Sequence, residues 1–196
     1  MNRVTKLLLI SDIFLISGFG FVAPILSIFI KDGLLGGQIY AAGLASMLFL
    51  LTKSCIQLPF SRYVDKYDHS IEWLIIGSLL TATVPFLYMY ATSVTHIYIA
   101  QVVYGIGSGL AYPPWLGLWS THLDRHHESY EWSLYSTLTG LGAAGAAAVG
   151  GALVELIGFK PTFFLVGIIS LLGCVALFFL RAKEPKRLRA RIPKKG

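Results

Sequence analysis

Two charged side chains lie inside long apolar stretches of this sequence, where charge is uncommon. Asp12 lies within the stretch at residues 4–30, and Lys53 lies within the stretch at residues 39–60. If these stretches cross a bilayer, each charge costs ~3 kcal/mol on insertion scales, so a charge retained there usually has a function. We expect Asp12 to be a proton-responsive carboxylate or a charged anchor in an internal cavity, and Lys53 to face the same cavity. Two structural alternatives stay open: a buried Asp12–Lys53 ion pair, or a Lys53 side chain that extends to the membrane surface.

Further polar and aromatic side chains share one helix face, because they are spaced by seven, four and three residues: Gln101, Ser108, Tyr112 and Trp115. Gln57 follows Lys53 by one helical turn and extends the polar face around that lysine. Amide, hydroxyl and aromatic groups together suit a pocket for a partly polar small molecule. Hydrogen bonds between helices and an aromatic residue at the membrane surface explain the same residues without a substrate. Pro113 and Pro114 interrupt the backbone hydrogen bonds and predict a hinge or free carbonyl groups.

Catalytic and metal-binding patterns are missing from the sequence. His126 and His127 are adjacent and point in different directions on a helix, and no third ligand accompanies them in a fixed position. Cys55 and Cys174 both lie in apolar stretches, so a structural disulfide is not expected. The sequence has no Ser-His-Asp spacing and no phosphate-binding glycine loop. We therefore expect no enzymatic activity, no cofactor and no metal.

The composition indicates which elements hold these residues. Of 196 residues, 55% are apolar or aromatic and only 13% are charged, whereas soluble domains have about 25% charged residues. Six apolar stretches are long enough to cross a ~30 Å hydrocarbon core as helices: residues 4–30, 39–60, 71–91, 96–119, 132–157 and 162–180. These values exclude a disordered chain and a soluble enzyme. They predict an all-α integral membrane protein whose six transmembrane helices form one bundle over residues 1–180.

The distribution of lysine and arginine predicts the orientation of this bundle. Thirteen of these residues lie at the amino terminus, in the second and fourth connections and in the tail at 181–196, against Lys31 and Lys160 on the other side. Positive charge accumulates on the cytoplasmic side of membrane proteins, so both termini are expected in the cytoplasm. We expect a multi-pass protein of the cell (cytoplasmic) membrane. The basic cytoplasmic tail fits contact with anionic lipid headgroups, and nucleic-acid binding is not expected.

The two halves of the chain share a sequence pattern. Two pairs of segments match at nearly the same shift: residues 18–24 with 107–113 at a shift of 89, and residues 61–65 with 151–155 at a shift of 90. Asp65 and Glu155 occupy equivalent positions in the second match, where each could cap or ion-pair with a neighbouring helix end. Such a fixed shift indicates an internal duplication. With three helices in each unit, residues 1–91 and 92–180 would enter the membrane in opposite senses, as a 3+3 inverted repeat.

Glycines are concentrated in the fourth and fifth stretches, where they permit close approach of helices. The ones that we expect to pack against neighbouring helices are Gly105, Gly109, Gly150 and Gly151. Sliding of helices during a conformational change is a second interpretation of the same residues.

Three segments resemble motifs of one family, the amino-terminal six-helix half of Major Facilitator Superfamily transporters, and its drug-antiporter-like branch in particular. The family's loop pattern G-x-L-(S/A)-D-(R/K)-x-G-R-(R/K) is similar to residues 61–70, with Asp65 and Lys66 at matching positions. The pattern R-x-x-x-G-x-G is similar to residues 101–107, with Gln101 in place of the arginine. The pattern G-x-x-x-G-P-x-x-G-G is similar to residues 142–151, with alanines in place of the central Gly-Pro.

This resemblance implies a secondary transporter, or permease, of a small-molecule substrate, working by alternating access between two six-helix bundles. It also implies that the first and fourth helices line the cavity and that Asp65 and Lys66 belong to a gating loop. One bundle cannot rock against itself. We therefore expect a half-size transporter that pairs with a second six-helix bundle, as a homodimer in the bilayer. The alternatives are the amino-terminal half of a longer twelve-helix transporter, and a non-transporting membrane interaction protein that keeps the fold.

Overall fold

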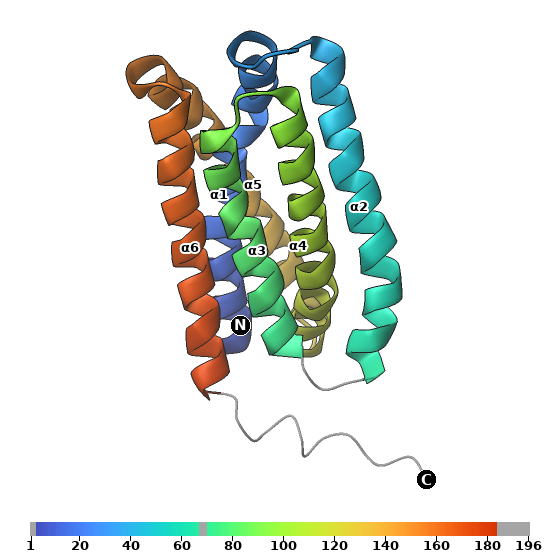
Figure 1. Cartoon of the computed structure of the whole chain (residues 1–196). Helices are drawn as coiled ribbons and strands as arrows, with labels where there is room; N and C mark the ends of the chain where they lie inside the picture. The colour runs from blue at the N-terminus through green and yellow to red at the C-terminus, as the bar shows by residue number, and fades with distance from the viewer. Residues whose placement is uncertain (1–2, 67–69, 184–196) are drawn as a thin grey trace.

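The chain forms a bundle of long helices. A computed structural model describes residues 3–66 and 70–183, so residues 184–196 of the expected basic tail lie outside the described residues. Over the described residues the regular structure is helical, apart from an isolated bridge between Leu35 and Ser93. The helices in Figure 1 are α1 (Arg3–Gly33), α2 (Ile39–Lys66), α3 (Ser70–Tyr90), α4 (Val94–Thr121), α5 (Glu128–Ile157) and α6 (Phe159–Lys183). The prediction of an all-α chain with six helices is confirmed.

Five of these helices are long and apolar enough to cross a membrane: α1, α2, α3, α5 and α6. The shortest of the six, α3, has 21 residues, which at 1.5 Å per residue reaches across a ~30 Å hydrocarbon core. α4 has 28 residues and is long enough, but it is not among the helices that are sufficiently apolar. Its polar and aromatic side chains, including Gln101 and Ser108, account for the difference. The expectation of six apolar spans is therefore confirmed for five helices.

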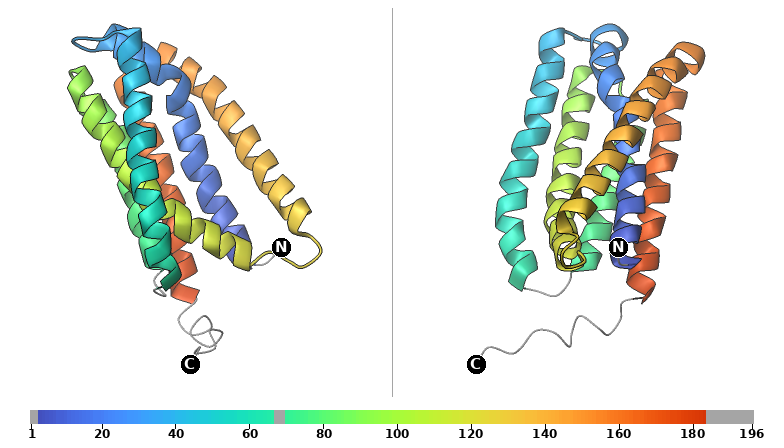
Figure 2. Two further views of the ribbon diagram at one scale, coloured as in Figure 1. Left: turned by 90° about the vertical axis from the view of Figure 1, so that its right-hand side faces the viewer. Right: turned by 180° about the vertical axis from the view of Figure 1, so that it is seen from behind.

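Consecutive helices run in opposite directions (Figure 1). We call the end where α1, α3 and α5 begin the lower end, and the end where α2, α4 and α6 begin the upper end. α4 packs mainly against α2 and α3, α1 packs mainly against α5 and α6, and α3 packs against α6. α1 and α4 themselves make few direct contacts. The two views in Figure 2 show the same bundle from the side and from behind.

Two clusters of buried apolar residues hold the bundle together at different depths. The upper cluster includes Phe29, Ile97 and Phe163. The lower cluster includes Leu8, Trp119 and Leu177. Each cluster joins side chains of α1, α3, α4 and α6. Between these depths α1 and α4 are free to line a cavity.

Glycines bring several helix backbones close together. A methyl group added at Gly107 would lie 2.6 Å from Thr81 Oγ1 and 2.9 Å from the Gly77 carbonyl oxygen, so α3 and α4 are in close contact there. α2 and α4 are similarly close, because a methyl group at Gly105 would lie 2.6 Å from Thr52 Cβ. Gly109 and Gly150 also face neighbouring helices closely, whereas a methyl group at Gly151 would meet no atom within 4 Å. A packing role for Gly151 stays a prediction, since this side of α5 is open in the bundle.

Pro113 and Pro114 lie inside α4, which stays helical through both. Proline removes a backbone donor and its ring disturbs the preceding turn, which commonly bends a helix. In the left-hand view of Figure 2, α4 changes direction in its lower part. This bend carries the last turns of α4 toward the start of α5. The hinge that the prolines predict is a motion, and it stays a prediction.

Candidate functional site

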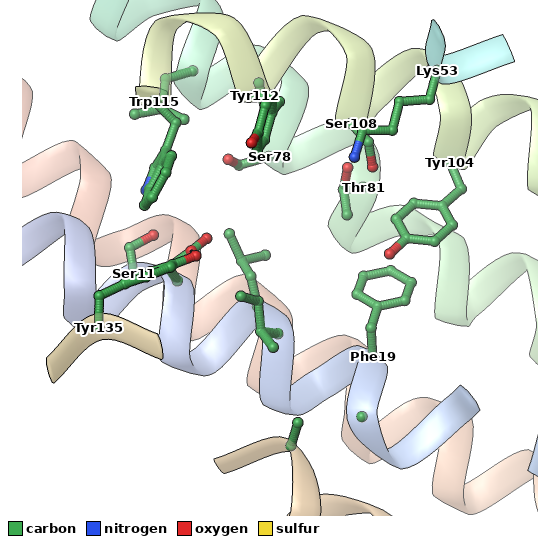
Figure 3. A pocket seen from close by; sticks show the side chains of 17 residues that line it. Ser11, Phe19, Lys53, Ser78, Thr81, Tyr104, Ser108, Tyr112, Trp115 and Tyr135 are labelled. Atoms are coloured by element: carbon green, nitrogen blue, oxygen red, sulfur yellow. The ribbon is translucent and has the colours of Figure 1, made fainter. Parts of the chain in front are cut away.

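A cavity of about 450 Å³ lies between the buried clusters and is partly open to the outside of the bundle. Side chains from α1, α2, α3, α4 and α5 line it, and α6 does not contribute (Figure 3). Its walls are mostly apolar, and its polar groups come from several different helices: Ser11, Asp12, Lys53, Ser78, Thr81, Ser108, Tyr104, Tyr112, Trp115 and Tyr135. A mainly apolar pocket with a few converging polar groups is the usual form of a small-molecule site.

Asp12 lies in this cavity and is held by a residue of α5. The Tyr135 hydroxyl donates a hydrogen bond to Asp12 Oδ2 over 2.5 Å. Tyr135 is itself packed among indole rings, with ring centroids 5.0 Å from Trp115 and 5.1 Å from Trp119. Packing in the aromatic cluster holds the Tyr135 ring in position. The Tyr135 hydroxyl in turn holds the Asp12 carboxylate at the lower end of the cavity.

Lys53 enters the cavity from α2, away from Asp12. Its Nζ lies 4.8 Å from the centroid of the Tyr112 ring and 6.0 Å from that of Phe49. Such a distance from a ring face is typical of a cation–π interaction. In Figure 3, Lys53 and Tyr104 lie on one side of the cavity, and Trp115 and Tyr135 lie on the other. Asp12 and Lys53 therefore line one cavity but do not form an ion pair with each other.

Two buried polar atoms of the cavity wall have no hydrogen-bond partner among the described residues. They are Ser78 Oγ, in a side chain that is 2% exposed, and Trp115 Nε1, in a side chain that is 6% exposed. Buried polar groups are normally satisfied, because an unmade hydrogen bond costs about 1–3 kcal/mol. Both atoms belong to residues that line the cavity.

Stacked aromatic rings form the wall at the upper end of the cavity. The Tyr104 ring lies between two phenylalanines, with centroids 4.2 Å from Phe19 and 4.1 Å from Phe49. These rings come from α4, α1 and α2, respectively. Phe19 and Tyr104 also line a separate pocket of about 200 Å³ above the stack. We call the three rings the aromatic stack; it separates the two cavities.

The polar face predicted on α4 is divided by this stack. Ser108, Tyr112 and Trp115 line the central cavity. Gln101 lines the upper pocket instead, where its side chain is 4% exposed and Oε1 has no hydrogen-bond partner among the described residues. Helical spacing predicts that these residues share one face of α4. It does not predict that aromatic rings from other helices divide the space beside that face into two pockets.

The remaining predicted residues lie outside the central cavity. Gln57 and Asp65 line a groove of about 580 Å³ between the lower halves of α2 and α4, which also includes Pro113. Lys66 is exposed at the lower end of α2, and Glu155 is exposed near the upper end of α5. The structure thus places Asp65 and Glu155 at opposite ends of the bundle. The roles expected of Asp65 and Lys66 in gating, and of Glu155 at a helix end, stay predictions.

Several site residues cannot be found from the sequence pattern. Tyr135, Tyr104 and Phe19 look like ordinary aromatic residues of apolar helices, and Ser78 looks like a small residue at a helix contact. Tyr135 and Asp12 are 123 positions apart. Only the packing of α1 against α5 brings the two together.

One family model and several known proteins are similar to this chain. A family model described as Major Facilitator Superfamily matches residues 8–195. The quinolone resistance protein NorA of Staphylococcus aureus is 22% identical over 188 residues, which cover 95% of this chain and 47% of NorA. MJ1560 of Methanocaldococcus jannaschii, named as an MFS-type transporter, is 22% identical over 158 residues, covering 81% of this chain and 40% of that protein. The crystal structure of the POT family transporter PepTSo matches all of this chain and 44% of its own, with a TM-score of 0.80 and 17% sequence identity. The chain spans a little under half the length of these proteins.

Proposed function

The chain belongs to the Major Facilitator Superfamily, and we propose that it forms one six-helix bundle of a secondary transporter for a small solute. Members of this family are membrane transporters, and the chain accordingly is a multi-pass membrane protein with several spanning helices. The observation that carries the proposal is the central cavity, which is lined by both an aspartate and a lysine in an otherwise apolar bundle. Charge at this depth is costly, and transporters retain it along substrate pathways.

An inverted repeat is part of the proposal, and helix packing supports it. If α1, α2 and α3 are equivalent to α4, α5 and α6, the pairing of α1 with α5 corresponds to that of α4 with α2. The pairing of α1 with α6 corresponds to that of α4 with α3, and the α3–α6 pair corresponds to itself. All of these pairs are the major contacts of the bundle. The proposed repeat units are residues 1–91 and 92–180.

A second six-helix bundle completes the proposed transporter. α3 and α6 pack against each other, whereas α2 and α5 form no major contact. α2 and α5 also expose large apolar side chains, including Leu50, Leu58 and Leu141. We propose that a second copy of this chain covers this side of the cavity, and that the two bundles rock about it to expose the cavity alternately. A second bundle within a longer polypeptide would serve the same role, and the sequence flanking the gene distinguishes the two.

We propose that the chain lies in the cell membrane and that the lower end of the bundle faces the cytoplasm. The lower end holds the starts of α1 and α5 and the loop with Arg125, and the upper end holds Lys31 and Lys160. The excess of positive charge at the lower end supports this orientation.

Flux into proteoliposomes tests the proposed function. The probe is a fluorescent quinolone, the drug class in the name of NorA. We expect wild-type protein to accelerate quinolone movement across the vesicle membrane, and Asp12→Asn to reduce the rate at least tenfold. Asp32→Asn, at the exposed upper end of α1, is the matched control and should keep the wild-type rate. A wild-type rate equal to that of empty liposomes contradicts quinolone transport.

A second candidate function is membrane interaction without transport. It is favoured by Gln101, a buried amide in the upper pocket at the position where the family pattern has arginine. Gln101→Ala distinguishes the candidates in the same assay. A role in transport predicts a changed flux, whereas an interaction protein shows no flux in either form.

A further inference from the structure

Among the described residues, neither Asp12 nor Lys53 forms an ion pair with an opposite charge. Asp12 accepts a hydrogen bond from the neutral Tyr135 hydroxyl, and Lys53 lies over the neutral Tyr112 ring. Neither contact removes a charge. In a medium of low dielectric constant, an uncompensated charge is expensive, and a bound ion of opposite sign offsets that cost.

The space between these charges is lined by aromatic rings. Tyr112 stacks near Trp115, with ring centroids 6.2 Å apart and an interplanar angle of 21°. Trp115 in turn lies 5.0 Å from Tyr135, which holds Asp12. A row of aromatic rings therefore runs from Lys53 to Asp12 along one wall of the cavity, as Figure 3 shows for its labelled members. Aromatic rings pack well against a flat apolar molecule, either stacked or edge to face.

From this arrangement we infer that the cavity binds a dipolar solute: a flat apolar core with a cationic group at one end and an anionic group at the other. The cationic group lies at Asp12, beside Trp115 and Tyr135. The anionic group lies at Lys53. The inference rests on the proposed function and specifies the substrate class of the same site.

Net charge supports the same class of solute. With Asp12 ionised and Lys53 protonated, the cavity carries no net charge, and a dipolar solute keeps it so. A solute with one charge leaves either Asp12 or Lys53 without a counterion and adds net charge to the membrane interior.

A series of related probes tests this inference by equilibrium binding in lipid nanodiscs. The parent compound is an aminomethyl-biphenyl-carboxylic acid, in which a rigid two-ring core separates an amine from a carboxylate. Its methyl ester carries only the positive charge, its N-acetyl derivative carries only the negative charge, and the doubly modified compound is neutral. Tryptophan fluorescence reports binding, because Trp115 lines the cavity. We expect the dipolar parent to bind about tenfold more tightly than any derivative, as expected for a charged hydrogen bond.

Substitutions of Asp12 and Lys53 test which charged group of the solute each residue binds. Asp12→Asn is expected to remove the advantage of the amine, so that the parent and its N-acetyl derivative bind equally. Lys53→Met is expected to remove the advantage of the carboxylate, and Lys53→Arg to restore it. Asp32→Asn and Lys31→Met, both at exposed positions at the upper end of α1, are the matched controls and should keep the wild-type ranking. Thermal unfolding of each variant shows whether it is folded.

Several binding results would overturn the inference without bearing on the proposed function. Equal binding of all four compounds, tightest binding of a singly charged compound, or no binding of any of them overturns the dipolar substrate class. A wild-type ranking retained by folded Asp12→Asn and Lys53→Met protein overturns it as well. None of these results affects the flux of quinolone into proteoliposomes. A wild-type flux equal to that of empty liposomes instead contradicts quinolone transport, whatever the ranking of the biphenyl compounds.

Discussion

At the scale of single residues, the hydrogen bond between Tyr135 and Asp12 organises the lower end of the cavity. It joins α5 to α1 through a carboxylate that the surrounding apolar residues cannot stabilise. Asp12 and Lys53 are predictable from the sequence, because a charge stands out in an apolar stretch. Tyr135, Tyr104 and Phe19 are not, because aromatic residues are common on every face of a membrane helix. Their importance depends on which helices pack together.

Tyr135→Phe tests this contact directly. The substitution leaves the ring in the aromatic cluster but leaves Asp12 without its hydrogen-bond donor, which we expect to destabilise the protein by about 1–3 kcal/mol. The midpoint of thermal unfolding in detergent measures the change. Tyr130→Phe is the matched control, since Tyr130 is an exposed residue on the same helix. If the two variants unfold at the same temperature, the contact does not stabilise the bundle.

At the scale of helices, small residues determine which elements pack closely. The helices themselves are predictable, because a long apolar stretch leaves a chain in lipid no alternative to internal hydrogen bonding. The pairing of the helices is not predictable from the sequence. α4 and α5 are consecutive in sequence but pack less closely than α1 and α5, which are far apart in sequence. Glycine content identifies helices that can approach closely, but not which glycine lies in the contact. Gly150 and Gly151 illustrate this, since they are adjacent and have different surroundings.

This adjacent pair provides a matched test of helix packing. A methyl group at Gly150 would lie 2.8 Å from the Phe21 carbonyl oxygen and 3.0 Å from Phe21 Cα, both backbone atoms of α1. Gly150→Ala must therefore push α5 away from α1, and we expect a loss of stability of about 1–3 kcal/mol. Gly151→Ala meets open space and should be neutral or stabilising by up to about 1 kcal/mol. Unfolding midpoints of the two variants give the comparison, and equal destabilisation would show that the α1–α5 contact differs from the one described.

At the scale of the whole molecule, the membrane orientation and the second bundle are the main proposals. Charge distribution predicts orientation from sequence alone, because translocation disfavours lysine and arginine. The cavity could not be predicted in the same way. The aromatic stack closes it above, and that stack needs rings from three separate helices.

Labelling of single cysteines tests the orientation. In a chain with Cys55→Ser and Cys174→Ala, we expect Gly36→Cys in the upper loop to react with an impermeant maleimide in intact cells. Arg125→Cys in the lower loop should react only after permeabilisation. The reverse pattern would place the lower end outside the cell.

Side-specific labelling of the cavity tests the central claim, that two bundles expose one site alternately. Ser108 lines the cavity below the aromatic stack, and Ser108→Cys in the same cysteine-free chain provides a thiol there. A charged, impermeant methanethiosulfonate is added to one face or the other of oriented proteoliposomes, and the rate of modification is measured. Modification from both faces is predicted, because alternating access requires the rings of the aromatic stack to separate and admit the reagent from the upper end. Modification from one face only, or from neither, would contradict the account.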